Sequence, residues 1–436
     1  MSTSVSRPSY RAVLQLPHAL RTFGSALFAR LSYGLVPLAV LLTTVDATGS
    51  YAVSGVVMAV FGGTMVVLTP FRATLVDRYG PRRALPPMAL AYAVFLCAFA
   101  LTAVRSGPSP LVLCGLIGLT GACAPPLGPT MRAVWSELAP DKRLLQRAYS
   151  LDGVAEELLF VTGPVVVGVL VGVAPPVTAV LVSAGVMVVG TWGFVRSPGV
   201  REFGAGAGAE GGVEVEVGGG DVGRDAGAGC AAGADSVAGA DSGAGAGACS
   251  PGGRSAQRRV LLIPLAVTAA TGLALSAADL LVTAFADQHG YTTGAAAWTL
   301  AALSVGSAAG GLLNGAVNWR TPARTRLPRF AAALGLLLIV AGASPGILTL
   351  AALLTLAGAF ITPVITTAYL IAEETATPAN RTRAGAWINT AVNAGSSAGA
   401  AGAGLLLARA PLGVCFAVAG LVALVTGAGG VWGERR

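Results

Sequence analysis

Long apolar segments follow one another along almost the whole chain, and this feature most restricts its fold. A helix needs about 20 apolar residues to cross the hydrocarbon core of a bilayer, which is about 30 Å thick. Such segments lie at residues 23–45, 49–70, 84–104, 109–131, 150–173, 177–196, 260–286, 293–317, 328–344, 346–371, 384–408 and 411–432. We therefore expect an all-α membrane protein with twelve transmembrane helices.

The composition excludes a water-soluble fold. Hydrophobic residues make up 54% of the chain and charged residues only 11%, whereas a globular protein has about 25% charged residues. The mean hydropathy is +0.73. The net charge of +8 comes almost entirely from arginine. These arginines lie mostly in short loops without interleaved aromatic residues, so we expect no binding to nucleic acid.

The positions of the basic residues predict how the chain is oriented. Lysine and arginine concentrate in short cytoplasmic loops. With the N-terminus inside, 19 basic residues near the span ends are cytoplasmic and two, Arg105 and Arg409, are external. The first span follows Arg7, Arg11 and Arg21 and is typical of an uncleaved transmembrane helix. We expect a multi-pass protein of the inner (plasma) membrane with both termini cytoplasmic.

A Gly- and Ala-rich segment at residues 197–258 divides the chain into two halves. It contains few large apolar residues and is predicted to be a disordered cytoplasmic linker, or alternatively a regulatory or partner-binding loop. Six spans in residues 1–196 and six in residues 259–436 then form two bundles. "GACAPP" at 121–126 and "GAFITP" at 358–363 are similar and similarly placed. Such a weak repeat is typical of a transporter with two related halves.

The chain lacks the patterns that would indicate an enzyme. It contains no nucleotide-binding Gly-rich loop, no Ser/His/Asp set and no metal-ligand spacing. The cysteines form no CxxC pair, and those within apolar spans behave as small hydrophobic residues. They are Cys97, Cys114, Cys123 and Cys415 in spans, with Cys230 and Cys249 in the linker. We expect no enzymatic activity, no cofactor and no metal.

The loop after the second span carries a family resemblance. Its sequence, ATLVDRYGPRRAL at residues 73–85, together with twelve spans and a long loop after the sixth, resembles the major facilitator superfamily. The residues in register are Leu75, Asp77, Arg78, Gly80, Arg82 and Leu85, whereas Ala73 and Pro81 depart from the usual pattern. The resemblance implies that this cluster latches the two halves in the outward-facing state. A simple topology anchor is the alternative.

Elementary chemistry gives this loop a structure without reference to any family. Gly80 permits a tight reversal of the chain. Asp77 can pair with an arginine or cap a neighbouring helix, while the arginines hold the loop at the inner face.

The fifth span contains a second resemblance. "VTGPVVVGV" at residues 161–169 is similar to the antiporter motif of drug-exporting branches of that superfamily. Pro164 removes a backbone hydrogen bond, and Gly163 and Gly168 allow close packing, so we expect a bend there. The resemblance implies export, whereas helix packing alone is the alternative.

Three carboxylates lead into the same span. Counting back from its outer end places Glu156 and Glu157 at the cytoplasmic edge of the membrane core and Asp152 outside it. Acids in a first helical turn also suit the helix dipole, which is the structural alternative. Arg30 lies at a similar depth in the first span and is costly there without a partner. We therefore expect an ion pair between Arg30 and one of these glutamates.

Asp279 is the most deeply placed acid. It lies about seven residues inside the seventh span, on the order of 10 Å, and an intramembrane acid is a functional candidate. It would couple transport to protons or bind a cationic substrate, or else form a structural hydrogen bond. Asn389 and Asn393 lie four residues apart on one face of the eleventh span. They would contact substrate or join helices.

Together these features predict a proton-coupled secondary transporter that exports a small amphipathic compound, such as a drug or secondary metabolite, by a rocker-switch cycle. Its partners would be that compound, protons and the lipid bilayer, and it would act as a monomer. Two alternatives remain open: a proton-coupled importer of a metabolite, and a membrane sensor that transports nothing.

Overall fold

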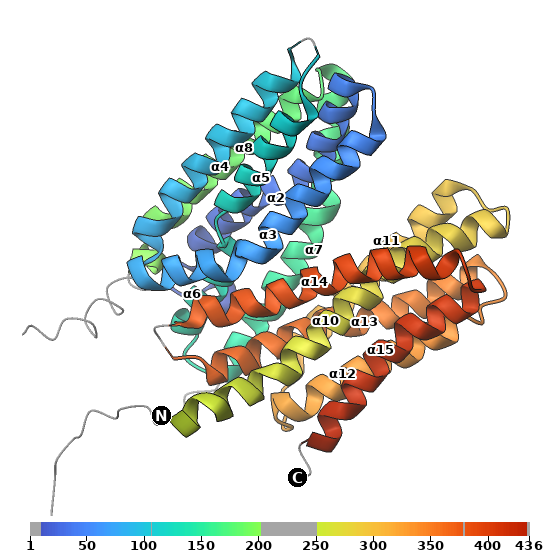
Figure 1. Ribbon diagram of the computed structural model, residues 1–436. Helices are drawn as coiled ribbons and strands as arrows, with labels where there is room; N and C mark the ends of the chain where they lie inside the picture. The colour runs from blue at the N-terminus through green and yellow to red at the C-terminus, as the bar shows by residue number, and fades with distance from the viewer. Residues whose placement is uncertain (1–9, 106, 202–250, 378–379, 434–436) are drawn as a thin grey trace, which may run out of the picture.

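The computed structural model describes residues 10–105, 107–201, 251–377 and 380–433, and their regular secondary structure is helical throughout (Figure 1). The first helices are α1 (Tyr10–Leu14), α2 (Ala19–Thr48), α3 (Tyr51–Tyr79), α4 (Pro81–Ala103), α5 (Pro110–Cys123), α6 (Leu127–Leu138), α7 (Lys142–Val173) and α8 (Val177–Arg196). They are followed by α10 (Pro251–Gln288), α11 (Thr293–Ala316), α12 (Ala323–Ala341), α13 (Ile347–Thr375), α14 (Arg381–Leu407) and α15 (Leu412–Gly433).

Ten segments of the described chain are helical, long and apolar enough to cross a membrane. They are α2, α3, α4, the α5–α6 pair, α7, α8, α10, α11, α13 and α15. Helix α12 begins among arginines and α14 is rich in Gly, Ala, Ser and Asn, which lowers their hydropathy. Both pack along apolar helices, α12 on α15 and α14 on α10. The protein is thus an all-helical, multi-pass membrane protein, and the twelve-span layout stays a prediction.

Two predicted boundaries were wrong. The span expected at 109–131 is broken between Cys123 and Leu127, because Pro125 and Pro126 lack the backbone N–H that a helix requires. Most of the expected linker, residues 202–250, lies outside the described residues. Its last part does not follow the prediction, because α10 already begins at Pro251.

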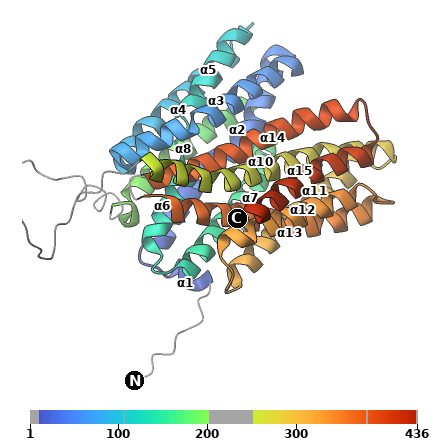
Figure 2. The same ribbon diagram turned by 60° about the horizontal axis from the view of Figure 1, so that its bottom comes forward.

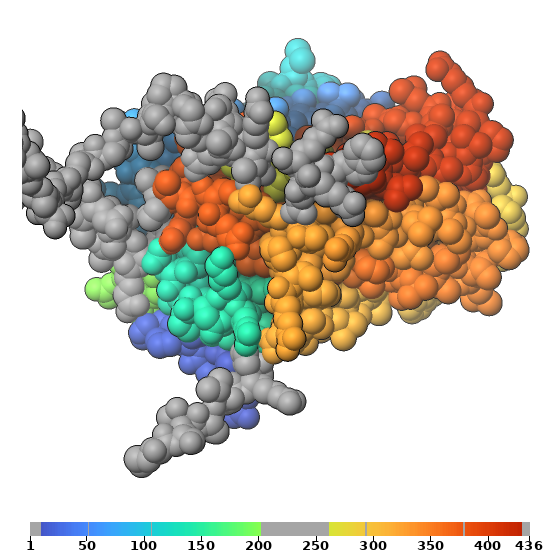
Figure 3. Space-filling view, turned by 90° about the horizontal axis from the view of Figure 1, so that it is seen from below, coloured from blue at the N-terminus to red at the C-terminus, as the bar shows by residue number. Residues whose placement is uncertain are grey.

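The helices form two groups that meet at one end. Helices α2 to α8 pack with one another, as do α10 to α15, and the groups diverge from their junction (Figures 1 and 2). We call this junction the closed end. It contains the C-terminal ends of α3 and α11, helix α6, and the N-terminal ends of α7 and α14. Figure 3 shows segments of both groups packed side by side there.

Glycines allow the closest backbone contacts between helices. A Cβ atom on Gly395 of α14 would lie 1.9 Å from the Ala269 carbonyl oxygen of α10. A Cβ on Gly310 of α11 would lie 2.0 Å from the carbonyl oxygen of Ala359 on α13. Lipid provides no hydrophobic drive between helices, so such small residues let backbones approach and gain van der Waals contact.

Replacing Gly395 by alanine should destabilise the protein, because the new methyl group meets the α10 backbone. Overpacking of this kind costs about 1–3 kcal/mol, measured as a lower thermal unfolding temperature in detergent. Gly402→Ala on the same helix is the matched control, since nothing lies within 4 Å of its Cβ position. Equal unfolding temperatures for the two variants would contradict this account of the α10–α14 contact.

Candidate functional site

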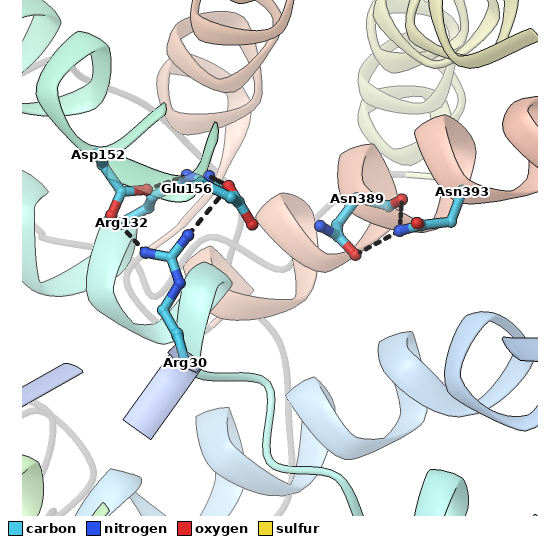
Figure 4. Close-up of polar contacts among 6 residues, drawn as sticks. All are labelled: Arg30, Arg132, Asp152, Glu156, Asn389 and Asn393. Atoms are coloured by element: carbon cyan, nitrogen blue, oxygen red, sulfur yellow. Dashed lines mark hydrogen bonds and ion pairs between the residues drawn. The ribbon is translucent and has the colours of Figure 1, made fainter. Parts of the chain in front are cut away.

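Four charged side chains form an ion cluster inside the first helix group, three of them buried and Glu156 29% exposed (Figure 4). Arg30 on α2 contacts Asp152 at 2.7 Å and Glu156 at 3.0 Å. Arg132 on α6 contacts the same two carboxylates of α7, at 2.8 Å and 2.5 Å. Each guanidinium bridges both acids and each acid binds both guanidiniums. The formal charges of this ion cluster therefore cancel.

The local fold explains why these residues meet. Asp152 and Glu156 are one helical turn apart on α7 and present both carboxylates on one face. Gly34 and Gly163 bring α2 and α7 into close contact, because a Cβ on Gly163 would lie 2.3 Å from the Gly34 carbonyl carbon. Gly34 is one turn beyond Arg30, so this close crossing holds the arginine beside the acids.

Burial makes this pairing obligatory. Asp152 is 0% exposed and Arg30 is 2% exposed. An uncompensated charge at such a position costs several kcal/mol, whereas paired and hydrogen-bonded charges are tolerated. Arg132 also stacks over the ring of Tyr369 on α13, at 3.9 Å from its centroid. The ion cluster therefore contacts the second helix group through this ring.

The expected ion pair between Arg30 and one of the two glutamates is present and involves Glu156, but two features of the site were not predicted. Asp152, expected outside the membrane core, is fully buried in the cluster because α2 and α6 cover it. Arg132 was counted among loop residues because the fourth span was expected to end at residue 131. The proline pair at 125–126 could have indicated this position of Arg132. The pair ends α5, and the new helix that follows it carries Arg132 inward.

Glu157 and Asp279 lie outside the ion cluster. Glu157 on α7 accepts a hydrogen bond from the Ser307 hydroxyl of α11 at 3.0 Å, and Ser307 also contacts Thr362 at 2.8 Å. The side chain of Asp279 on α10 is exposed rather than enclosed among helices. It is within electrostatic reach of Glu157. Asp279 forms no ion pair among the described residues.

The two asparagines of α14 bind each other. The Asn393 amide donates to the backbone and side-chain oxygens of Asn389, at 2.8 Å and 2.9 Å (Figure 4). Asn393 is exposed and Asn389 is half-buried. Asn389 also contacts the side chain of Tyr369 on α13. The polar atoms of the two asparagines lie on the same α14 face as predicted.

The loop after α3 forms a contact between the helix groups. The Asp77 carboxylate accepts hydrogen bonds from the backbone N–H groups of Thr382 at 3.1 Å and Arg383 at 2.8 Å. These donors belong to the first turn of α14, whose own N-cap residue Asn380 makes no side-chain cap bond. Asp77 therefore caps a helix of the other group, and its negative charge suits the positive end of the helix dipole.

The rest of this loop positions Asp77. Gly80 has φ +76°, a backbone conformation that favours glycine, and it ends α3 and begins α4. The Arg78 guanidinium lies 5.4 Å from the centre of the Tyr79 ring. Arg82 is exposed in the first turn of α4.

A second contact between the helix groups joins α7 to the C-terminal end of α11, whereas Asp77 caps the N-terminal end of α14. The Gln146 amide donates to the Asn314 carbonyl at 2.6 Å, and the Arg147 guanidinium donates to the Ala316 carbonyl at 3.3 Å. Both carbonyls belong to the last turn of α11, where helix geometry leaves them without a partner. The Tyr10 hydroxyl of α1 donates to the nearby Leu312 carbonyl. Donors from the first group thus cap the C-terminal end of a helix of the second.

Arg72, expected in the inner loop, is another buried cation. It is 4% exposed within α3. Its guanidinium donates to the Gly121 carbonyl at 2.5 Å and to Met65 and Thr69 of its own helix. Gly121 is in the last turn of α5, so Arg72 stabilises the helix end that the proline break creates.

The glycine–proline motif of α7 has only part of its expected role. Gly163 packs closely against α2, as described above. No atom lies within 4 Å of a Cβ at Gly168, so the prediction of close packing was wrong there. Pro164 lies inside α7, which continues as a helix to Val173.

Contacts between the groups end near Glu157. On the α7–α11 side the last hydrogen bond is that of Glu157 with Ser307. On the α3–α14 side it is that of the Thr390 hydroxyl with the Val66 carbonyl, at 3.4 Å. Further along α7, Val161 and Val165 are 54% and 61% exposed. Glu157 therefore lies at the limit of the closed end.

Within the described ranges, no group of three or more His, Cys, Asp or Glu side chains is arranged to hold a metal ion. The free thiols there are Cys97, Cys114, Cys123 and Cys415.

These features define a multi-pass membrane protein with the fold of a transporter: two helix groups, charges buried between helices and contacts confined to one end. Residues 22–342 match the Major Facilitator Superfamily, and the chain belongs to this family. Members of the family are transporters rather than enzymes. No curated protein matches the sequence significantly.

Solved structures support the fold. The chain is similar to the human organic anion transporter MFSD10 (TETRAN), with 15% identity, a TM-score of 0.65, and coverage of 96% of this chain and 99% of that one. The Escherichia coli fucose:proton symporter FucP has 15% identity, a TM-score of 0.61 and coverage of 96% and 99%. A bacterial homologue of the iron transporter ferroportin, outward-facing with soaked iron, has 12% identity, a TM-score of 0.69 and coverage of 94% and 98%.

Replacing Asp152 by asparagine should strongly destabilise the protein. The change keeps the side-chain shape but leaves two buried guanidiniums with one carboxylate, and breaking such a pair costs about 3–5 kcal/mol. The readout is thermal unfolding in detergent. Lys142→Ala is the control, because Lys142 is 82% exposed in its pair with Glu374, and an exposed pair contributes at most about 1 kcal/mol. Similar losses in both variants would refute a stabilising role for the buried cluster.

Proposed function

We propose that this protein is a proton-coupled secondary transporter that exports a small amphipathic compound by antiport. It would act as a monomer in the inner (plasma) membrane. The closed end would face the cytoplasm, as the distribution of basic residues predicts. In this proposal the structure represents an outward-facing state of a rocker-switch cycle.

The proposal depends mainly on the position of two carboxylates. Glu157 comes from the first helix group and lies where the contacts between groups end. Asp279 comes from the second group, and its side chain is exposed. A substrate or proton arriving from the open side would meet them before reaching the closed end. An acid within a membrane-spanning helix is a functional candidate, and the buried ion cluster holds no free carboxylate for this role.

The coupling would follow from competition at Asp279. Its ionised carboxylate attracts a cationic or proton-donating part of the substrate, whereas the neutral form does not. A proton taken up from outside would displace the substrate, and loss of that proton to the cytoplasm would prepare the next cycle. Glu157, bonded to Ser307 on the opposite group, would transmit the change of charge to the α7–α11 contact.

The rocking step would break the two helix caps at the closed end. Asp77 would leave the N-terminal turn of α14, and Gln146 and Arg147 would leave the C-terminal turn of α11. The ion cluster ties α2, α6 and α7 together, so these helices would move as one body. The outward-facing state described for the ferroportin homologue, whose fold is similar, is consistent with this assignment.

Asp279→Asn should abolish export while leaving the protein folded, because the amide cannot exchange a proton. In a pump-deficient bacterial host, we expect wild-type protein to protect against some members of a panel of amphipathic antibiotics and dyes. For ethidium, the variant should lower the efflux rate at least about tenfold, the equivalent of ~1.4 kcal/mol. An uncoupler should have the same effect on the wild type.

Asp287→Asn, at the exposed end of the same helix, is the matched control and should keep wild-type efflux. Efflux that survives Asp279→Asn but not Glu157→Gln would move the proton site to α7. Efflux that persists with an uncoupler would contradict proton coupling. If membrane-inserted protein protects against no compound, the export proposal fails, and uptake assays then separate an importer from a sensor.

Asp77→Ala should open the closed end. The variant loses two charge-assisted hydrogen bonds, each worth about 1.5–3 kcal/mol, so the open population should rise at least about tenfold. Spin labels on cysteines introduced at the exposed positions Arg143 and Arg320, in a background without native cysteines, would report it. Pulsed electron paramagnetic resonance should show a longer distance between the labels. Asp46→Ala, at the other end of α2, should leave the distance unchanged, and an unchanged distance in Asp77→Ala would exclude the latch.

A further inference from the structure

The outer surface of the first helix group contains a small apolar groove between α4 and α8. These helices lie side by side (Figure 1). The groove has a volume of about 170 Å³ and is lined chiefly by Pro86, Pro87 and Leu90 of α4 and by Val188 and Trp192 of α8. The hydroxyl of Thr191, which also lines it, donates to the sulfur of Met187. The lining is therefore mainly apolar, and the Thr191 hydroxyl is directed to a neighbour on its own helix.

A basic rim borders the groove at the closed end. The Arg196 guanidinium lies over the Trp192 ring, 4.6 Å from its centroid, at the last turn of α8. Arg82 and Arg83 precede Pro86 and Pro87 by one helical turn and so lie on the same face of α4. All three arginines are exposed. The first turn of α4 contains no acidic residue to neutralise them.

We propose that this groove binds an anionic phospholipid. One acyl chain lies against the prolines, Leu90 and Trp192, and the phosphate contacts Arg83 and Arg196. A soluble anion could contact the arginines but would leave the apolar groove empty. The apolar lining therefore favours a lipid over a soluble anion. The basic rim selects a negative headgroup over a zwitterionic one, because each arginine near an anionic headgroup contributes about 1 kcal/mol.

Charge and shape argue for a lipid rather than a protein at this surface. A specific protein interface engages about 20–30 residues on each side, whereas seven residues line the groove. A single acyl chain is long, thin and flexible and fills such a space without a matching surface. The inference is independent of the transported compound and of the direction of transport, since it concerns the lipid-facing side of α4 and α8.

Native mass spectrometry of the full-length protein in detergent tests the proposal. The protein is titrated with phosphatidylglycerol and, separately, with phosphatidylcholine of the same acyl chains. We expect the first phosphatidylglycerol to bind at least about tenfold more tightly than phosphatidylcholine. Arg83→Gln/Arg196→Gln should weaken phosphatidylglycerol binding roughly 25-fold, about fivefold for each arginine, and leave phosphatidylcholine binding unchanged.

Two further variants separate the groove from general surface charge. Arg320→Gln/Arg324→Gln removes two exposed arginines from the second helix group and should change binding less than about twofold, since these residues are on the other helix group from α4 and α8. Leu90→Trp keeps every arginine but fills the groove, and it should weaken phosphatidylglycerol binding about tenfold by displacing a few methylenes.

Equal binding of the two lipids by wild-type protein would overturn the proposal. So would an equal loss of binding in the Arg320/Arg324 variant, or full binding by Leu90→Trp. Size-exclusion chromatography of each variant verifies that it is folded, so a loss of lipid binding is distinguished from a loss of structure.

Discussion

Every charge enclosed by apolar helices needs a compensating partner, and the architecture of this protein depends on that requirement. Arg30, Arg132, Asp152 and Glu156 satisfy it as a neutral square of ion pairs from three helices. Removing one buried member leaves the cluster with an uncompensated charge, which is strongly destabilising. The square therefore fixes how α2, α6 and α7 lie relative to one another. Other contacts, including the glycine crossing of α2 on α7, work within that geometry.

Helix ends obey the same requirement. The last carbonyls and the first N–H groups of a helix have no partner within it, and in a membrane water is scarce. This chain supplies partners from elsewhere: Arg72 for α5, Gln146 and Arg147 for α11, and Asp77 for α14. The last two sets join different helix groups. The same physical need that completes a helix thus also determines where the two groups meet.

The sequence predicted well what depends on local pattern and poorly what depends on helix neighbours. Runs of apolar residues indicated the helices, and matched depth indicated a pair between Arg30 and either Glu156 or Glu157. Arg132 and Arg72 were assigned to loops, because hydropathy alone does not reveal their partners. It does not show that the proline break turns Arg132 inward. Nor does it show that Arg72 caps the helix end that this break creates. The prolines of the two similar segments, 121–126 and 358–363, illustrate this limit of sequence-based prediction. Pro125 and Pro126 end a helix, whereas Pro363, in the matching segment, lies inside continuous α13.

The caps shared between helix groups have a further consequence for motion. In the proposed rocking step, the N–H groups of Thr382 and Arg383 and the carbonyl of Ala316 would lose their partners together. The Asn314 carbonyl would lose Gln146 but keep its bond to the Trp319 indole. Within a protein only water can replace those partners quickly. Opening this end is therefore also a hydration event, in which several water molecules enter as the helices part. The free energy of that step depends on the activity of water as well as on the ligands the protein binds.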